Sequence, residues 1–167
     1  MRRLELDFEL QASTEPGKRM VELAEKHASD FAVTAAEHDR NGTFPVENIS
    51  ALKKSGFAGA AVPKEFGGMG VTSIHDCVVA MNRLGRAEGS TPLAFTMHLS
   101  RTLGTARALR NAIVSGNQAR QNRAENMLKK IGAGELLSLS PTQNRAPMSE
   151  LRKPWPPRLT AVGYSTA

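Results

Sequence analysis

Apolar residues recur along the first 134 positions with the three- and four-residue spacing of amphipathic helices. The pattern predicts a first helix over residues 15–38, with Ser13 or Thr14 as its N-cap and Asn41-Gly42 as its end. The residues on its apolar face are Met20, Val21, Ala24, His27, Ala28, Phe31, Ala32 and Ala35. One side of this helix is therefore expected to face a core.

Four more helices are predicted downstream. Their expected ranges and signals are 46–54 after Pro45, 74–87 capped by Ser73, 90–115 opened by Ser90-Thr91-Pro92, and 119–131 before Gly132 and Gly134. The stretch over residues 57–71, FAGAAVPKEFGGMGV, is too rich in glycine for a regular element. We expect a loop there whose apolar residues pack beneath the neighbouring helices. The predicted fold class is all-α, an up-and-down bundle of about five helices.

The chain changes character after Gly134. The segment GELLSLSPTQ is typical of a short extended stretch, and five of the nine prolines fall between Pro141 and Pro157. The PWPP run prevents regular strand pairing. We predict an N-terminal tail over residues 1–14, a helical domain over 15–134, and an irregular, interrupted start of a further domain over 135–167.

Composition narrows the class of protein. The chain has 167 residues, 40% of them hydrophobic, a formal net charge of +6 and one cysteine. A lone Cys77 excludes an intramolecular disulfide and is expected to be a buried apolar side chain. The sequence has no signal-peptide core and no run long enough to span a membrane, so we expect a cytoplasmic protein.

Charge is distributed unevenly. Residues 1–100 carry 11 Lys/Arg against 13 Asp/Glu, whereas residues 101–167 carry 11 against 3. A basic C-terminal third could bind nucleic acid. The cations are scattered, however, and Trp155 and Tyr164 are the only aromatic residues after position 100, so stacking on bases is not favoured.

Two local patterns have simple structural interpretations. The Gly67–Gly70 turn precedes a helix, but it lacks the lysine of a P-loop and a preceding strand, so a packing turn is favoured over a nucleotide site. The four histidines, His27, His38, His75 and His98, are dispersed, and we predict no metal site.

Several segments together resemble the N-terminal helical domain of the acyl-CoA dehydrogenase family. They are AAEHDRNGTFPVENISALKKSGFAGAAVPKEFGGMGVTSIHDCVVAMNRLGR, then GSTPLAFTMHLS and GAGELLSLSPTQ, covering roughly residues 20–140. Their order and spacing carry the resemblance, since none is a catalytic motif by itself.

The resemblance implies a three-domain flavoprotein that uses FAD to oxidise an acyl-CoA to an enoyl-CoA. In that family a β-barrel domain holds the flavin and a C-terminal helical domain supplies the catalytic glutamate, and both would lie beyond Ala167. The chain therefore offers no catalytic residue, and we expect little activity from it alone. Its partners would be acyl-CoA and the other dehydrogenase domains or subunits.

The resemblance also implies cofactor-binding positions. The first barrel strand and its turn would place Leu139, Thr142 and Ser149 near the flavin. Gln143 stands where the family has glutamate, and the glycines of the family's turn are absent. We therefore expect that this turn does not retain FAD.

Three hypotheses follow. The chain is an inactive N-terminal fragment of such an enzyme, or a module that assembles with separately encoded dehydrogenase domains, or a basic helical module that binds nucleic acid. In the first two, the helix bearing Met97 and His98 would lie near the acyl pocket. The faces that carry Phe57, Val62, Phe66, Phe95 and Met97 are expected to be left exposed to water.

Overall fold

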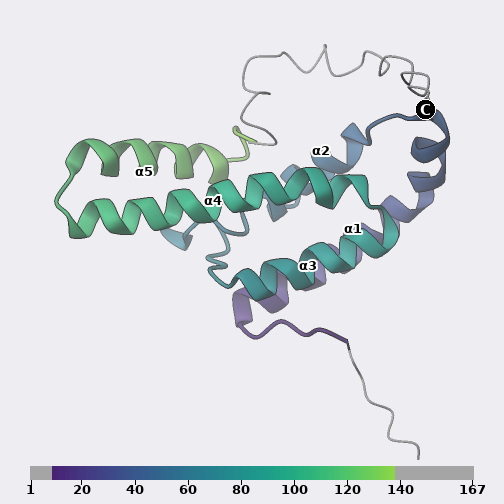
Figure 1. Ribbon diagram of the computed structural model, residues 1–167, viewed down its shortest axis with the longest axis horizontal. Coiled ribbons are helices and arrows are strands. Elements are labelled where there is room, and N and C mark those ends of the chain that lie inside the picture. Colours follow the sequence, from purple (N-terminus) through teal and green to yellow (C-terminus); the bar gives the residue numbers. More distant parts are fainter. Residues whose placement is uncertain (1–8, 138–167) are drawn as a thin grey trace, which may run out of the picture.

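A computed structural model describes residues 9–137, and this part of the chain is helical (Figure 1). The helices are α1 Glu15–Asn41, α2 Val46–Lys54, α3 Ile74–Ala87, α4 Ser90–Val114 and α5 Gln118–Gly132, with two short 3-10 turns, η1 Phe57–Gly59 and η2 Lys64–Phe66. Residues 9–137 contain no strand. The all-α prediction is confirmed, and both bounds of every predicted helix lie within three residues of the observed ones. The predicted irregular tail lies almost entirely outside the described residues.

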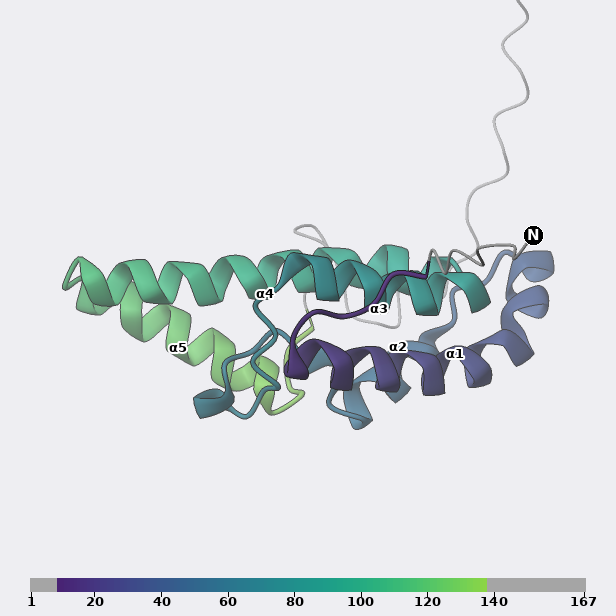
Figure 2. The ribbon, with the colours of Figure 1, turned by 90° about the horizontal axis from the view of Figure 1, so that it is seen from below.

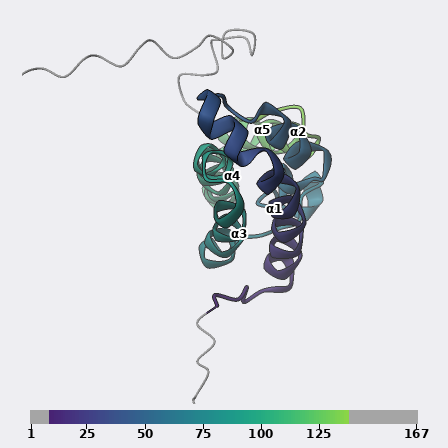
Figure 3. The same cartoon turned by 90° about the vertical axis from the view of Figure 1, so that its right-hand side faces the viewer.

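The helices form two layers. Figure 2 shows α3 and α4 along one side of the molecule and α1 and α5 along the other, and Figure 3 shows the same layering from one end. α1 packs mainly against α3, and α4 mainly against α5. The predicted face of α1 is buried at Met20, Val21, Ala24, His27 and Phe31, whereas Ala32 is exposed.

The start of α1 is fixed by a carboxylate from α3. Thr14 is the N-cap, and its hydroxyl accepts a hydrogen bond from the Gly17 amide at 3.1 Å. The Asp76 carboxylate accepts hydrogen bonds from the amide and hydroxyl of Ser13, at 2.8 and 2.9 Å, and from the amide and hydroxyl of Thr14, at 3.1 and 2.5 Å. Burial opposes ionisation of Asp76, but these hydrogen bonds outweigh it and hold its pKa at about 2. Asp76 therefore ties α1 to α3.

The end of α1 uses the predicted glycine. Gly42 adopts a left-handed conformation with φ of 60°, and its amide donates to the Asp39 carbonyl at 3.3 Å. This conformation is easy for glycine and strained for other residues, so Asn41-Gly42 ends the helix as expected.

The glycine-rich loop packs against the neighbouring helices, as predicted, although it includes the two 3-10 turns that the pattern did not predict. Its buried apolar residues are Phe57, Ala58, Ala60, Ala61, Val62 and Val71. Backbone segments touch closely here: a Cβ on Gly68 would lie 2.0 Å from the Val62 carbonyl oxygen, and one on Gly132 would lie 2.0 Å from that of Phe66. Only glycine permits these approaches.

The expectation of exposed apolar faces is largely wrong. Phe57, Val62 and Phe95 are fully buried, because the loop and α4 pack their side chains against each other. Phe66 is partly buried and packs beside the Val62 cluster. Of the five residues, only Met97 has a largely exposed side chain.

The start of α4 is stabilised by Glu88, which lies two residues before the helix. The Glu88 carboxylate accepts hydrogen bonds from the Ser90 amide at 2.7 Å, the Thr91 amide at 2.8 Å and the Ser90 hydroxyl. Asn48 of α2 donates to the Thr91 hydroxyl at 3.1 Å, which fixes the short helix against the long one. Among residues 9–137, no helix is both long and apolar enough to cross a bilayer.

Candidate functional site

The outer face of α3 and α4 carries an apolar surface, which we define by Ile74, Val78, Leu93 and Met97. Ile74 and Val78 lie one turn apart on α3 and are 71% and 53% exposed, and Leu93 and Met97 lie one turn apart on α4 and are 75% and 48% exposed. The buried residues of α3 and α4 lie on the opposite sides of these helices, so these four side chains point away from the core. Figure 2 shows that α3 and α4 form one layer of the molecule. Large apolar side chains exposed on neighbouring helices are candidates for an interaction surface.

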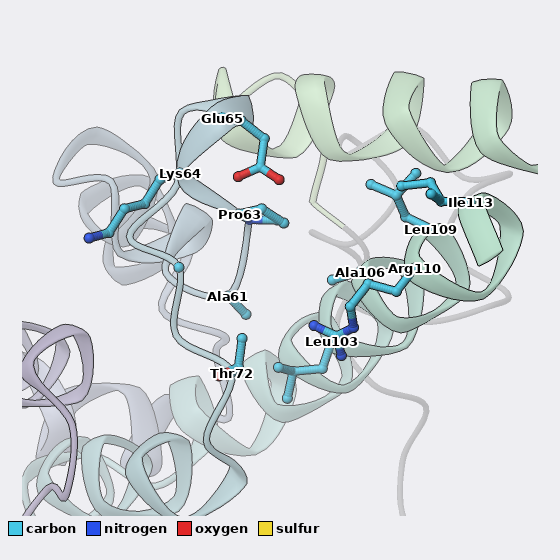
Figure 4. Close-up of a pocket in the computed structure, with 11 residues that line it drawn as sticks. Ala61, Pro63, Lys64, Glu65, Thr72, Leu103, Ala106, Leu109, Arg110 and Ile113 are labelled. Carbon is cyan, nitrogen blue, oxygen red and sulfur yellow. The ribbon is translucent and has the colours of Figure 1, made fainter.

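A groove opens on the other flank of α4, between that helix and the loop over residues 61–72 (Figure 4). Its volume is about 340 Å³. The loop contributes Ala61, Pro63, Lys64, Glu65, Gly70 and Thr72, and α4 contributes Leu103, Ala106, Leu109, Arg110 and Ile113. The floor is apolar, and charges stand at the rim.

A second hollow of about 560 Å³ lies where the end of α1 meets the start of α4. His38 lines it, with Nδ1 at 2.8 Å from the Thr43 hydroxyl and Nε2 at 2.5 Å from the Glu47 carboxylate. Glu88 also lines it and already caps α4. These polar groups hold the chain together, so the hollow is structural.

The glycine turn before α3 is a packing turn, as predicted. Its amides are used inside the protein: Gly68 donates to the Pro63 carbonyl, Met69 to the Gly59 carbonyl and Gly70 to the Val62 carbonyl. A phosphate would need free amides at this turn. These three amides are therefore not available to bind the phosphate of a nucleotide.

The histidines behave as structural residues. Nε2 of His27 lies 2.7 Å from the Ser55 hydroxyl, and Nε2 of His98 lies 2.8 Å from the Ala58 carbonyl. Burial lowers the pKa of both imidazoles, which favours their neutral forms. Within residues 9–137 no group of histidine, cysteine and acidic residues is placed to hold a metal ion. Because His98 points into the core, Met97 is the member of that pair that faces a surface.

Cys77 is buried, as predicted, and burial raises the pKa of its thiol to about 11. A thiol with so high a pKa is mostly protonated at neutral pH and is a poor nucleophile.

The predicted flavin positions, Leu139, Thr142 and Ser149, lie outside the described residues and remain predictions. The described residues do not fit a flavin by themselves, since both hollows are open at the surface and the amides of the Gly68–Gly70 turn are already bonded. Asp76 and Glu88 are the buried carboxylates among residues 9–137, and both accept hydrogen bonds from residues at the start of a helix. No step of a flavin reaction is therefore assigned to them.

Comparison with known proteins identifies the family. Residues 14–111 match the model of the acyl-CoA dehydrogenase N-terminal domain, which is more than half of the chain. The chain belongs to the acyl-CoA dehydrogenase-like flavoenzyme family.

Individual relatives differ in how much of the chain they match. The amino sugar nitrososynthase RubN8 of Streptomyces rubradiris is 35% identical over 74% of this chain and 28% of its own length. The structure of KijD3 in complex with FMN and dTDP-3-amino-2,3,6-trideoxy-4-keto-3-methyl-D-glucose is 38% identical, with a TM-score of 0.70 over 75% of this chain and 30% of KijD3. The putative acyl-CoA dehydrogenase YdbM of Bacillus subtilis is 35% identical over 50% of this chain and 22% of its own. The chain thus spans about three tenths of the length of the nitrososynthases it matches.

Proposed function

We propose that this chain acts as the N-terminal helical part of a flavin-dependent enzyme that oxidises the amino group of a nucleotide-linked sugar. The observation that carries this proposal is the extent of similarity. RubN8 and KijD3 match about three quarters of the chain, whereas YdbM matches half at a similar identity. FMN in the KijD3 structure makes FMN a candidate cofactor beside the FAD that the family resemblance implies.

A second candidate is the oxidation of an acyl-CoA to an enoyl-CoA. The match of residues 14–111 to the acyl-CoA dehydrogenase N-terminal domain favours it. The two candidates share a domain plan and differ in substrate, so a substrate comparison separates them.

The role of this chain in either reaction is to dock the flavin-bearing domains. The α3–α4 apolar surface supports this role, because its four large apolar side chains are exposed to solvent. Burying apolar area yields ~25 cal/mol per Å², so covering a few hundred Å² contributes several kcal/mol to assembly. The occupant proposed for this surface is the part of the enzyme that corresponds to the remaining seven tenths of KijD3.

The test mixes the 167-residue chain with a KijD3 from which the matching helical segment has been removed. The chain alone should elute from gel filtration without a flavin spectrum. The mixture should elute as a complex that retains flavin and oxidises the KijD3 amino sugar but not an acyl-CoA. Oxidation of the acyl-CoA alone would instead favour the second candidate.

A matched pair of variants locates the docking surface. Leu93→Lys places a charge on the α3–α4 apolar surface and should abolish the complex. Val33→Lys is the control, because Val33 is 81% exposed on α1, in the other layer. A mixture that never forms a complex, or a Leu93→Lys chain that assembles like the wild type, would contradict the proposal.

A further inference from the structure

The groove between α4 and the loop over residues 61–72 has walls that are already in place. The loop wall is held by hydrogen bonds from the Gly70 amide to the Val62 carbonyl and from the Val71 amide to the Ala60 carbonyl, both 2.9 Å. On the α4 wall, Ala106 belongs to the buried cluster that α4 forms with α5. Neither wall needs a ligand to form, which is a property of most small-molecule sites.

The charges at the rim are arranged unevenly. Figure 4 shows the Arg110 side chain reaching back along α4 toward Leu103, while the Lys64 side chain points away from the groove. The Glu65 carboxylate faces the space from the loop wall (Figure 4). A helical side chain leans toward the N-terminus of its helix, which explains why Arg110 lies over Leu103 and Ala106.

Arg110 has no ionic or hydrogen-bonding partner among residues 9–137, and it does not pair with Glu65 across the groove. A guanidinium offers a planar pair of donors that matches a carboxylate or a phosphate. Beside it lies an apolar floor made by Leu103, Ala106 and Ile113. The volume of about 340 Å³ is at the lower end of the range for ligand pockets.

We propose that this groove binds a small amphipathic oxyanion, with its apolar body on the α4 floor and its carboxylate or phosphate against Arg110. Glu65 sets the orientation of the ligand in the groove. Its negative charge repels the anionic end of the ligand, so that end is expected to lie beside Arg110. The site is separate from the α3–α4 apolar surface and does not depend on the proposed enzymatic function.

The test is a titration of the full 167-residue chain, followed by nuclear magnetic resonance of its backbone amides. The probes are hexanoate and hexyl phosphate, which carry the two candidate head groups, with hexan-1-ol and hexylammonium as controls. The two anions should shift the amides of Thr72, Leu103 and Arg110. Hexan-1-ol and hexylammonium should bind about tenfold more weakly, since they lack the charge-assisted hydrogen bonds. The tighter of the two anions identifies the head group.

Variants connect the binding to the groove. Arg110→Gln should raise the dissociation constant of the anions about tenfold. Arg101→Gln, an exposed residue of the same helix outside the groove, should leave it unchanged. Ile113→Asp changes a 55% exposed floor residue without disturbing the core, and it should also weaken binding. The proposal is overturned if Arg110→Gln binds like the wild type, if hexan-1-ol binds as tightly as hexanoate, or if the shifted amides lie elsewhere.

Discussion

Replacing Gly132 with alanine should destabilise the protein, although glycine to alanine in a helix normally does the opposite. Gly132 is the last residue of α5, and a Cβ there would lie 2.0 Å from the Phe66 carbonyl oxygen. Alanine in an open helical position gains up to about 1 kcal/mol over glycine. Overpacking costs about 1–3 kcal/mol, and a backbone carbonyl cannot rotate aside as a side chain can. The upper end of that range leaves a net loss of about 2 kcal/mol.

The assay is thermal unfolding of the 167-residue chain, followed by circular dichroism in the helical bands. Gly132→Ala should lower the Tm by about 6 °C. The matched control is Gly104→Ala in α4, where a Cβ meets no atom within 4 Å and should raise the Tm by about 3 °C. A Gly132→Ala protein as stable as the wild type would refute the inference that α5 and η2 meet backbone to backbone.

Four further predictions concern buried polar groups and the thiol. Asp76→Ala should lower the free energy of unfolding by about 2–4 kcal/mol, because two residues of the α1 N-terminus lose a charged acceptor, and urea unfolding will measure it. Since the pKa of Asp76 falls from 3.8 to about 2 on folding, its contribution is present above pH 3.8 and is lost as the pH falls through 2; an acid titration of Asp76→Asn that matches the wild type would contradict this. Burial lowers the pKa of His27 and His98 below 6.5, so the imidazoles of the unfolded chain take up protons first as the pH falls. The free energy of unfolding should therefore be highest above pH 6.5 and decrease below it. A urea midpoint that does not change between about pH 7.5 and 5 would argue against neutral buried imidazoles. Cys77 should react with a thiol reagent far more slowly in the folded protein than in urea, and equal rates would show that the site between α1 and α3 is open.

The helices could be predicted from the sequence because each has an apolar face with regular spacing and a recognisable cap. Thr14 and Gly42 bound α1 as the pattern indicates, and Ser73 caps α3 by accepting from the Asp76 amide at 3.2 Å. These signals act over three or four residues, so they do not depend on the rest of the fold.

Long-range contacts could not be predicted in the same way. Phe57 and Val62 are internal because Gly68 and Gly132 let backbone segments approach, and Gly132 lies 66 residues along the chain from Phe66, whose carbonyl it faces. The Asp76 carboxylate looks like an ordinary acid in the first turn of a helix, yet it binds residues at the start of α1. The Ser13-Thr14 pair was the available signal in the sequence for this contact. Only one of two successive capping residues is needed as the N-cap of α1, so the hydroxyl of the other can bond a distant acceptor.

The groove was not predicted because its two walls come from separate parts of the chain. Arg110 belongs to a helix with scattered basic residues, and the sequence does not distinguish it from Arg101 or Arg107. Its position opposite the loop at Thr72 sets it apart. The flavin positions Leu139, Thr142 and Ser149 remain predictions from resemblance.

The pairing of α1 with α3 has a consequence for synthesis on the ribosome. α1 is complete at Asn41, but its packing partner is complete only at Ala87. At about 5–20 residues per second, the apolar face of α1 is therefore synthesised several seconds before its main packing partner. The α4–α5 hairpin is different, because residues 115–117 join its helices and its contacts are local. A nascent chain halted before α3 would present the Met20 and Phe31 face to chaperones and proteases, whereas the second half of the domain can close as soon as it emerges.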